Sequence, residues 1–474
     1  MLTVNSADDV TMMPSASIDG SLAPLRTDDY GPLGYLRLSE DDLALFSELD
    51  HTGEFVFDDP SQAIKGAGGI VRRGKWNYTP ASANDDDHTP TEITVAVKVI
   101  RGFTTNPNIA LRLCRELSTW LDLLRVDSFV ELLDVRLSRL SGTIFYVMPF
   151  VPYTVRSLSR DDSIVLTEQA VRSIVAQVLL GIRFMHKRSI LHRDLWSANI
   201  LVDVVRGTSE AATTRADETS GNTDGRVEFR VSICDFGMSR MTCPSEKFMT
   251  RGVVAQWYRA PELLLDVGYG PASDMWSLGA VFGELLRRDV LFAAAVGDQY
   301  AQTEQLLTIL GPMPLSLFEP GKAFASSSKR ASVIQHLNQQ LASPSSILRE
   351  YVSSASVSSP PSLKGVSKEA FDLLEQMLQF DPDQRCTAEG ALTHPWFHPR
   401  RGDKGQNGPD PITVYIQEQL AAQDRELITL NSRQAALDVA TLSVNTPLKE
   451  LDANIDRLVK ELSQQVQTMR EAVS

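Results

Sequence analysis

The pattern of hydrophobic and polar positions predicts both strands and helices in the first half of the chain. Residues 92–100 (EITVAVKVI) form a β-branched run, and residues 143–151 (TIFYVMPFV) form a second apolar run, as strands do. Between them, residues 106–124 carry apolar side chains at the three- and four-residue spacing of an amphipathic helix. Residues 166–188 follow the same spacing and are apolar enough for a long, mostly buried helix.

Long polar segments interrupt this pattern. Residues 1–53 are acidic and rich in Ser, Asp and Pro, residues 77–92 and 204–227 are polar, and residues 324–366 are rich in serine. None of these segments has enough apolar surface to offset the conformational entropy lost on ordering. We therefore expect the first to be largely disordered and the other three to be solvated loops. Residues 401–411 are rich in Gly and Pro and predict a linker.

The end of the chain has a second helical period. Apolar residues recur seven apart on two seams, Leu448, Ile455, Leu462 and Met469 on one and Leu451 and Leu458 on the other. Such heptads predict a coiled coil with a partner through residues 448–472. An amphipathic helix docked on the chain's own folded domain explains the pattern equally well.

Composition and charge narrow the class of protein. Hydrophobic residues make up 43% and charged residues 22% of the chain, as in ordinary globular proteins. The formal net charge of -14 argues against general binding to nucleic acid. No uncharged apolar run approaches the length of a membrane span, and the N-terminus does not resemble a signal peptide. The four cysteines are scattered without a CxxC pair, which favours a reducing compartment, so we expect a cytoplasmic or nuclear protein.

Residues suited to phosphoryl transfer occur in one order along the chain. Transfer from ATP needs a cation on the α- and β-phosphates, ligands for magnesium and a base near the incoming hydroxyl. Lys98 lies in the predicted strand VAVKV, and Glu116 lies on the following helix, placed to pair with it. HRDLWSAN supplies Asp194 as the base and Asn199 as a metal ligand, and CDFG supplies Asp235 as the second metal ligand. HRD, DFG and APE in this order, with asparagine at this spacing, are very improbable by chance.

With these motifs, the chain resembles the eukaryotic protein kinase family from about residue 54 to residue 400. The resemblance implies an α+β, two-lobed protein kinase fold, with a small antiparallel β-sheet in the N-lobe, a mainly helical C-lobe and a helical C-terminal tail. It divides the chain into an acidic extension (1–53), an N-lobe (54–148), a C-lobe (149–400) and a linker with an amphipathic tail (401–474). It implies ATP and Mg²⁺ as cofactors and a structural ion pair between Arg385 and Glu262.

The resemblance also implies a nucleotide pocket. The segment AIKGAGGIV matches a glycine-rich loop in which Ile64 replaces the first glycine. Glycine allows backbone N–H groups to approach a phosphate closely. Met148 is expected to close the back of the adenine pocket, and residues 149–152 are expected to form the hinge between the lobes. The expected nucleotide contacts are Gly66, Gly69, Val71, Ala96, Lys98, Met148 and Val151.

The segments QWYRAPELLL and EQLLTILGPMP resemble the cyclin-dependent and mitogen-activated branch, and most closely cyclin-dependent-kinase-like Ser/Thr kinases. This implies a proline-directed kinase acting on Ser/Thr-Pro in a protein substrate, and it leaves a cyclin-like activator as a hypothesis. It also implies activation by phosphorylation of Thr250. The expected phosphate ligands are Arg115, Arg193 and Arg240, and the expected pocket for the residue after the phosphoacceptor is Val253, Val254 and Arg259.

Two residues near Asp194 depart from the family pattern. Trp196 stands where relatives carry a lysine, and Ala255 stands where Ser/Thr kinases usually carry a threonine. Loss of one preorganised cation of this kind reduces rates by roughly 10²–10³-fold in comparable sites. An active, slow kinase and a catalytically weak nucleotide-binding scaffold are both compatible with these changes. The base and both metal ligands are present, which favours the active kinase.

Overall fold

The computed structural model describes thirteen stretches of the chain: residues 45–47, 49, 52–59, 63–66, 69–78, 91–138, 141–206, 227–241, 255–295, 297–340, 345–354, 360–399 and 410–434. The predicted heptad segment at 448–472 lies outside these residues. Within the described residues, no helix is both long and apolar enough to cross a membrane.

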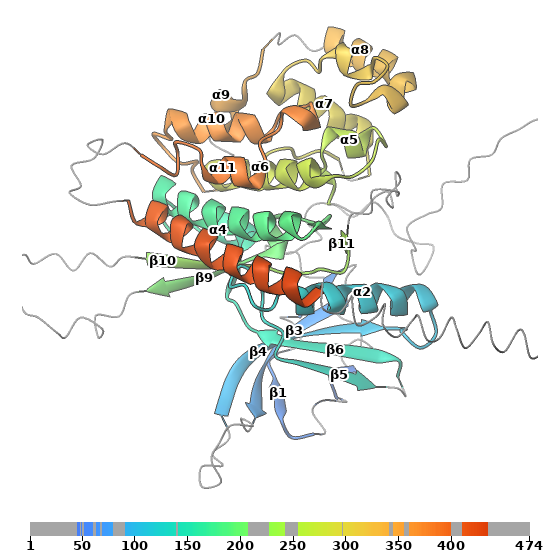
Figure 1. The fold of residues 1–474 in the computed structure, drawn as a ribbon, viewed down its shortest axis with the longest axis vertical. Helices are drawn as coiled ribbons and strands as arrows, with labels where there is room; N and C mark the ends of the chain where they lie inside the picture. The colour runs from blue at the N-terminus through green and yellow to red at the C-terminus, as the bar shows by residue number, and fades with distance from the viewer. Residues whose placement is uncertain are drawn as a thin grey trace, which may run out of the picture.

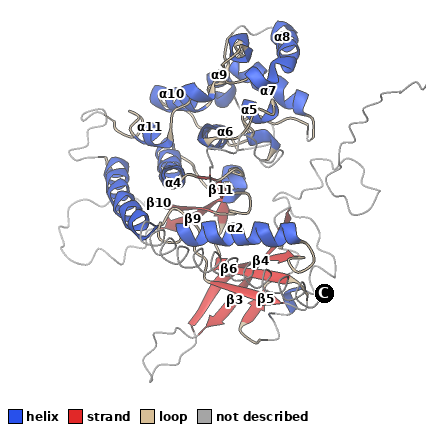
Figure 2. Ribbon diagram, turned by 45° about the vertical axis from the view of Figure 1, so that its right-hand side comes forward, coloured by secondary structure: helices blue, strands red, loops and turns tan. Residues whose placement is uncertain are grey.

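An antiparallel sheet forms the first lobe, with strand order β1-β3-β4-β6-β5 and β2 paired with β3. Its strands are β1 (Phe55–Phe57), β2 (Ile64–Gly66), β3 (Gly69–Tyr78), β4 (Thr91–Arg101), β5 (Asp134–Ser138) and β6 (Thr143–Pro149). The predicted strands correspond to β4 and β6. Figures 1 and 2 show this sheet at one end of the molecule, with helix α2 (Pro107–Leu123) lying across it.

The two faces of β4 contact different parts of the protein, because successive side chains of a strand point to opposite sides. Val95, Val97 and Val99 are buried in an aromatic cluster that includes Phe55. Residues 96 and 98 lie in between, so they point to the opposite side, where α2 and the second lobe lie. The period of two in the sequence thus places Lys98 on the inner side of the sheet.

The second lobe is mainly helical (Figure 2). Its α-helices are α3 (Val155–Arg160), α4 (Glu168–Lys187), α5 (Pro261–Leu264), α6 (Pro271–Arg287), α7 (Gln299–Leu310), α8 (Ala331–Gln340), α9 (Leu348–Ser353), α10 (Lys368–Met377) and α11 (Ala388–Leu392). Its short strands are β7 (Tyr153–Thr154), β8 (Ile190–Leu191), β9 (Ile200–Arg206), β10 (Val227–Ile233) and β11 (Arg240–Met241). The 3-10 turns are η2 (Ser197–Asn199), η3 (Gln256–Tyr258), η4 (Leu315–Phe318), η5 (Ala325–Arg330) and η6 (Pro382–Gln384).

The α4 helix runs through the core of this lobe, and α6 packs against it. The predicted helix at 166–188 corresponds to α4, which is capped by the Thr167 side chain on the N–H of Ala170. Such a cap satisfies one of the free N–H groups at the start of a helix. The α+β kinase fold with a small antiparallel sheet and a mainly helical second lobe is confirmed.

The prediction of a solvated loop at 324–366 is wrong for much of the segment. The segment contains α8 and α9, and Phe324, Ile334 and Leu348 are buried. Some of its apolar residues do lie three or four apart, such as Ile334 and Leu337 or Leu348 and Val352, but serines surround them, so the segment looks polar on average. Phe324, Ile334, Leu348 and Val352 nevertheless reach buried positions, and this burial helps to compensate for the cost of ordering the serine-rich chain between them.

A helix over residues 411–434 lies along α4 and reaches toward α2 (Figure 1). Arg183, near the end of α4, donates to Asp424 Oδ1 at 2.7 Å, and the Gln423 amide donates to the Leu180 carbonyl at 3.1 Å. Near the far end of the helix, Glu426 lies 3.8 Å from the guanidinium of Arg125, which directly follows α2 and its C-cap. The first part of the predicted tail is thus docked on the two-lobed domain.

Burial of Ile416 should contribute strongly to this docking. Its side chain is 1% exposed, so Ile416→Ala should lower the free energy of unfolding by about 2–5 kcal/mol through lost burial and an unfilled cavity. Ile428 lies on the same helix and is 67% exposed, and it offers a matched control. Thermal denaturation should show a clear fall in Tm for Ile416→Ala and little change for Ile428→Ala. Equal shifts would mean that the helix is not held by this contact.

Candidate active site

Lys98 is the centre of a buried cluster of charges between the sheet and the second lobe. Its Nζ lies 3.0 Å from Glu116 Oε1 and 2.9 Å from Asp235 Oδ1. Burial alone would lower the pKa of Lys98, but the charges of Asp235 and Glu116 raise it above its ordinary value. The pKa of Asp235 is held below its ordinary value, because attraction to Lys98 outweighs the opposing effect of burial. Lys98 and Asp235 are therefore both charged at neutral pH.

An aromatic column holds α2 in the position that this ion pair requires. The ring of Trp120, one turn after Glu116, lies 5.8 Å from the ring of Phe236, and His192 lies 5.8 Å from Phe236 on another side. The Trp120 indole also donates to the Val130 carbonyl at 2.7 Å. Residues from the helix, the DFG motif and the catalytic loop are thus packed as one unit.

Sequence reasoning missed the role of Arg112. This side chain lies one turn before Glu116 on α2, and its Nε donates to the Gly237 carbonyl at 3.1 Å. A Cβ atom at Gly237 would lie 2.8 Å from the Arg112 guanidinium and 3.2 Å from Glu116, so a larger residue there would displace the arginine. The signal was available in the sequence, because residues four apart on a helix share a face.

Asp194 and Asn199 face each other across the catalytic loop. The Asn199 amide nitrogen donates to the Asp194 carbonyl at 2.8 Å and lies 3.4 Å from its carboxylate. Burial and the charge of Asp235 raise the pKa of Asp194 to about 7. Because the Asn199 nitrogen is used within the loop, its amide oxygen is available for a metal ion. That oxygen and the Asp235 carboxylate are ligand types that Mg²⁺ accepts, so the residues fit a magnesium site.

Asp274, at the start of α6, anchors the backbone of the catalytic loop. Its carboxylate accepts hydrogen bonds from the N–H groups of His192 and Arg193, both at 3.0 Å. It also contacts His186 Nε2 at 3.0 Å and accepts a short hydrogen bond from the Tyr269 hydroxyl. Arg193 has a φ of +68°, a left-handed conformation that is rare for this residue type. The buried carboxylate stabilises this strained turn directly before Asp194.

Most of the expected nucleotide contacts lie on neighbouring strands. In the sheet, Val71 pairs with Lys98 and Ala96 pairs with Met148, so these four residues form adjacent rows. Gly66 pairs with Gly69 at the turn between β2 and β3. Val151 follows β6 and is half-buried. The sheet register therefore places Val71, Ala96 and Met148 on rows next to Lys98.

The expected regulatory and substrate-binding residues are only partly described. Thr250, Val253 and Val254 lie outside the described residues. Arg193 is buried, and its pKa is lowered by burial and by the nearby positive charge of Arg240.

Arg115 is exposed on α2. Burial also lowers the pKa of Arg259, while the charge of Asp194 opposes this shift. Two of the three expected phosphate ligands, Arg193 and Arg240, thus lie near each other, and Arg259 lies near Asp194.

Trp196 and Ala255 have defined positions beside Asp194. The Trp196 ring is half-buried, 6.2 Å from the ring of Tyr258. The neighbouring Ser197 hydroxyl lies 2.9 Å from the Tyr258 hydroxyl, which donates to the buried Glu284 at 2.6 Å. The main-chain N–H of Ala255 hydrogen-bonds the Asp194 carboxylate and lowers its pKa, against the larger effect of burial. The backbone at 255 therefore still positions Asp194 without a threonine side chain.

Comparison with known proteins gives a consistent picture. Residues 83–397 match the family described as Protein kinase domain. The chain is 31% identical over 304 residues to Cyclin-dependent kinase G-2 of Oryza sativa subsp. indica, which covers 64% of this chain and 38% of that protein. It is 30% identical over 359 residues to Mitogen-activated protein kinase 7 of Arabidopsis thaliana, which covers 74% and 83%. The chain thus spans well under half the length of the rice protein.

A solved structure of the CAK complex from Chaetomium thermophilum bound to ATP-gamma-S contains a similar chain. The match has a TM-score of 0.52 and 22% sequence identity, and it covers 79% of this chain and 98% of that chain. At this level of identity, the similarity concerns the fold alone.

Proposed function

The chain belongs to the protein kinase family, with distant relatives among the cyclin-dependent and mitogen-activated kinases, and from this premise we propose that it transfers the γ-phosphate of ATP to serine or threonine in protein substrates. The observation that supports this most strongly is the position of Lys98 between Glu116 and Asp235, at 3.0 and 2.9 Å. A chain that had lost nucleotide chemistry would have no need to keep two buried charged groups and a third, partly buried one together, because burial of charges is costly.

Each residue has a separate task in the proposed reaction. Lys98 binds the α- and β-phosphates, and Glu116 holds its side chain in place. Asp194 orients the substrate hydroxyl and accepts its proton, for which a pKa of about 7 is suitable. Asn199 and Asp235 would hold Mg²⁺, which supplies positive charge to the phosphate oxygens when it is bound. The main-chain N–H of Ala255 keeps the Asp194 carboxylate in its orientation.

Phosphate transfer to a peptide tests this function directly. The full chain, labelled ATP, Mg²⁺ and a Ser-Pro peptide should give labelled peptide, and Asp194→Asn should give none above background. The same peptide with alanine after serine should be a poorer substrate. ATP binding without transfer in the wild-type protein would instead support the nucleotide-binding scaffold. Equal rates for both peptides would refute only the proline preference.

Proline direction rests on the resemblance at Val253, Val254 and Arg259, together with the relatives. In that family pattern, the backbone beside the phosphoacceptor leaves no partner for an incoming N–H group. Proline has no N–H to satisfy and is therefore favoured there. A cyclin-like activator is the corresponding proposal for the outer face of α2, where Leu111 and Leu121 are exposed.

Phosphorylation of Thr250 is the proposed activating step. A phosphate adds about two negative charges, which would be bound by Arg193 and Arg240 and by Arg115 once the segment is in place. Thr250→Ala should lower kcat at least about tenfold, since these arginines otherwise repel one another. Mass spectrometry of active protein should find phosphate on Thr250. Full activity of the alanine variant would show that the cluster does not control the enzyme.

A further inference from the structure

Arg156 lies close to two tryptophan rings at the edge of the proposed active site. It is in the first turn of α3, whose start is fixed by a reciprocal pair of hydrogen bonds between Thr154 and Ser157. Its guanidinium carbon lies 6.0 Å from the centre of the Trp196 ring and 5.7 Å from the centre of the Trp257 ring. Arginine and tryptophan at such distances attract each other through the ring's negative face. The rings therefore hold the cation in one place.

The position of this arginine relates it to the reaction. Trp196 is two residues after Asp194, and Trp257 is two residues after Ala255, whose N–H bonds the Asp194 carboxylate. The two rings that contact Arg156 thus lie close in sequence to Asp194, the proposed base, and to Ala255, which hydrogen-bonds it. The nucleotide side is already supplied with a cation, Lys98, whose partners are Glu116 and Asp235. The positive charge of Arg156 would therefore act on the protein substrate, near the hydroxyl that receives the phosphate.

A structural role in the protein core does not fully explain the position of Arg156. The buried carboxylate of Glu284 is close enough to Arg156 to be affected by its charge. Burial raises the pKa of Glu284, and the hydrogen bond from Tyr258 and the positive charge of Arg156 oppose this shift. Glu284 nevertheless takes its hydrogen bond from the Tyr258 hydroxyl at 2.6 Å. Among the residues that the structure describes, the half-buried Arg156 donates no hydrogen bond and forms no ion pair, although a guanidinium has five N–H donors.

We propose that Arg156 is a specificity-determining residue that binds an anionic side chain of the protein substrate close to the phosphoacceptor. The side chain would be aspartate, glutamate or a phosphorylated residue, because a fixed, partly desolvated guanidinium binds carboxylate and phosphate through paired hydrogen bonds. This inference rests on the proposed kinase function. The proposal predicts that the substrates of this enzyme carry an acidic or phosphorylated residue close to the serine or threonine that is phosphorylated.

Peptide pairs test the proposal. A Ser-Pro peptide with glutamine at every neighbouring position is compared with peptides in which glutamate, or phosphoserine, is placed at each of these positions in turn. The wild-type enzyme should prefer an anionic residue at one or two positions by about tenfold in kcat/KM. Arg156→Gln should remove that preference and keep its rate on the glutamine peptide. Arg156→Lys should retain part of it, because the charge remains and the paired geometry is lost.

Arg160, exposed in the last turn of the same helix, is the matched control. Arg160→Gln should leave the preference unchanged, and Arg156→Glu should favour lysine at the position where the wild type favours glutamate. A wild type that phosphorylates all peptides equally would overturn the proposal and leave the kinase function intact. A loss of kcat on every peptide in Arg156→Gln, with the preference kept, would also overturn it. No transfer to any peptide by the wild type would refute the proposed function itself.

Discussion

Lys98→Met and Asp235→Asn are each expected to lower kcat for peptide phosphorylation by at least roughly 10²–10³-fold, because each removes a preorganised charge beside the phosphates. Lys98 is in contact with both carboxylates, at 3.0 and 2.9 Å. Its removal leaves Glu116 and Asp235 without a cation in a buried site, so nucleotide binding should also weaken. Asp235→Asn removes a metal ligand and should raise the Mg²⁺ concentration needed for activity. Initial rates at varied ATP and Mg²⁺ concentrations measure both effects.

Lys75→Met is a matched control for Lys98→Met. Lys75 is also a lysine of the first-lobe sheet with a carboxylate partner, Glu92, at 2.7 Å, but both side chains are about half exposed. Exposed pairs of this kind have small effects on stability and none on the site. Loss of activity in Lys98→Met with normal activity in Lys75→Met would assign the effect to the site. Unchanged activity of Lys98→Met or Asp235→Asn would refute the assignment of these residues.

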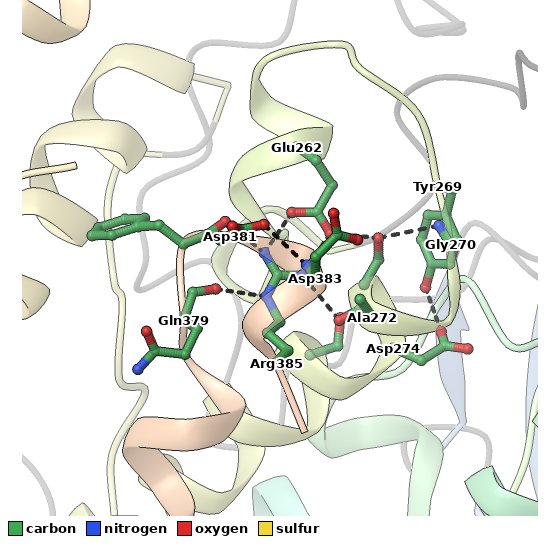
Figure 3. A network of polar contacts seen from close by, with 12 residues as sticks. Glu262, Tyr269, Gly270, Ala272, Asp274, Gln379, Asp381, Asp383 and Arg385 are labelled. Atoms are coloured by element: carbon green, nitrogen blue, oxygen red, sulfur yellow. Dashed lines mark hydrogen bonds and ion pairs between the residues drawn. The ribbon is translucent and has the colours of Figure 1, made fainter. Parts of the chain in front are cut away.

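The second large effect is expected for the ion pair between Glu262 and Arg385, which joins the APE motif to the segment before α11 (Figure 3). Arg385 Nη1 and Nη2 lie 2.6 and 2.7 Å from the two carboxylate oxygens. Arg385 also donates to the Gln379 and Ala272 carbonyls, and Ser273 donates to Glu262 at 2.7 Å. The Arg385 side chain is 0% exposed, so every one of these bonds is screened from water.

Arg385→Met should therefore lower the free energy of unfolding by about 3–5 kcal/mol, because Glu262 becomes an unpaired buried charge. Denaturant unfolding measures the change. Arg349→Met is the control, since Arg349 forms a comparable pair with Glu375 at 2.7 Å in which both side chains are partly exposed. That variant should differ little from the wild type. A similar small effect for both substitutions would mean that the buried pair does not stabilise the lobe.

Much of the fold and of the site could be predicted because it depends on local patterns. The β-branched period of β4 determines the face on which Lys98 lies, and the helical period of α2 determines the face of Glu116. Contacts between segments far apart in the sequence could not be read in this way. The docking of helix 411–434 on α4 buries Ile416, but it also uses Arg183 and Gln423, two polar residues that resemble ordinary surface residues in the sequence.

The surroundings of Trp196 show the same limit. The sequence identifies Trp196 as a departure from the family pattern but does not reveal which residue it contacts. Arg156, Trp196 and Trp257 come from three separate segments, and only the folded chain brings the guanidinium of Arg156 close to both rings. The order in the serine-rich segment was missed for a related reason. Its apolar residues form only two short helical stretches among many serines, and their burial depends on the shape of the lobe that they join.

The most direct test of the central claim is transfer of labelled γ-phosphate from ATP to a Ser-Pro peptide by the purified full chain with Mg²⁺. The wild-type protein should phosphorylate the peptide despite Trp196 and Ala255, and Asp194→Asn should abolish the signal while still binding ATP. A wild-type protein that carries phosphate on Thr250 and binds ATP with Mg²⁺, but transfers no more phosphate than Asp194→Asn, would contradict the account.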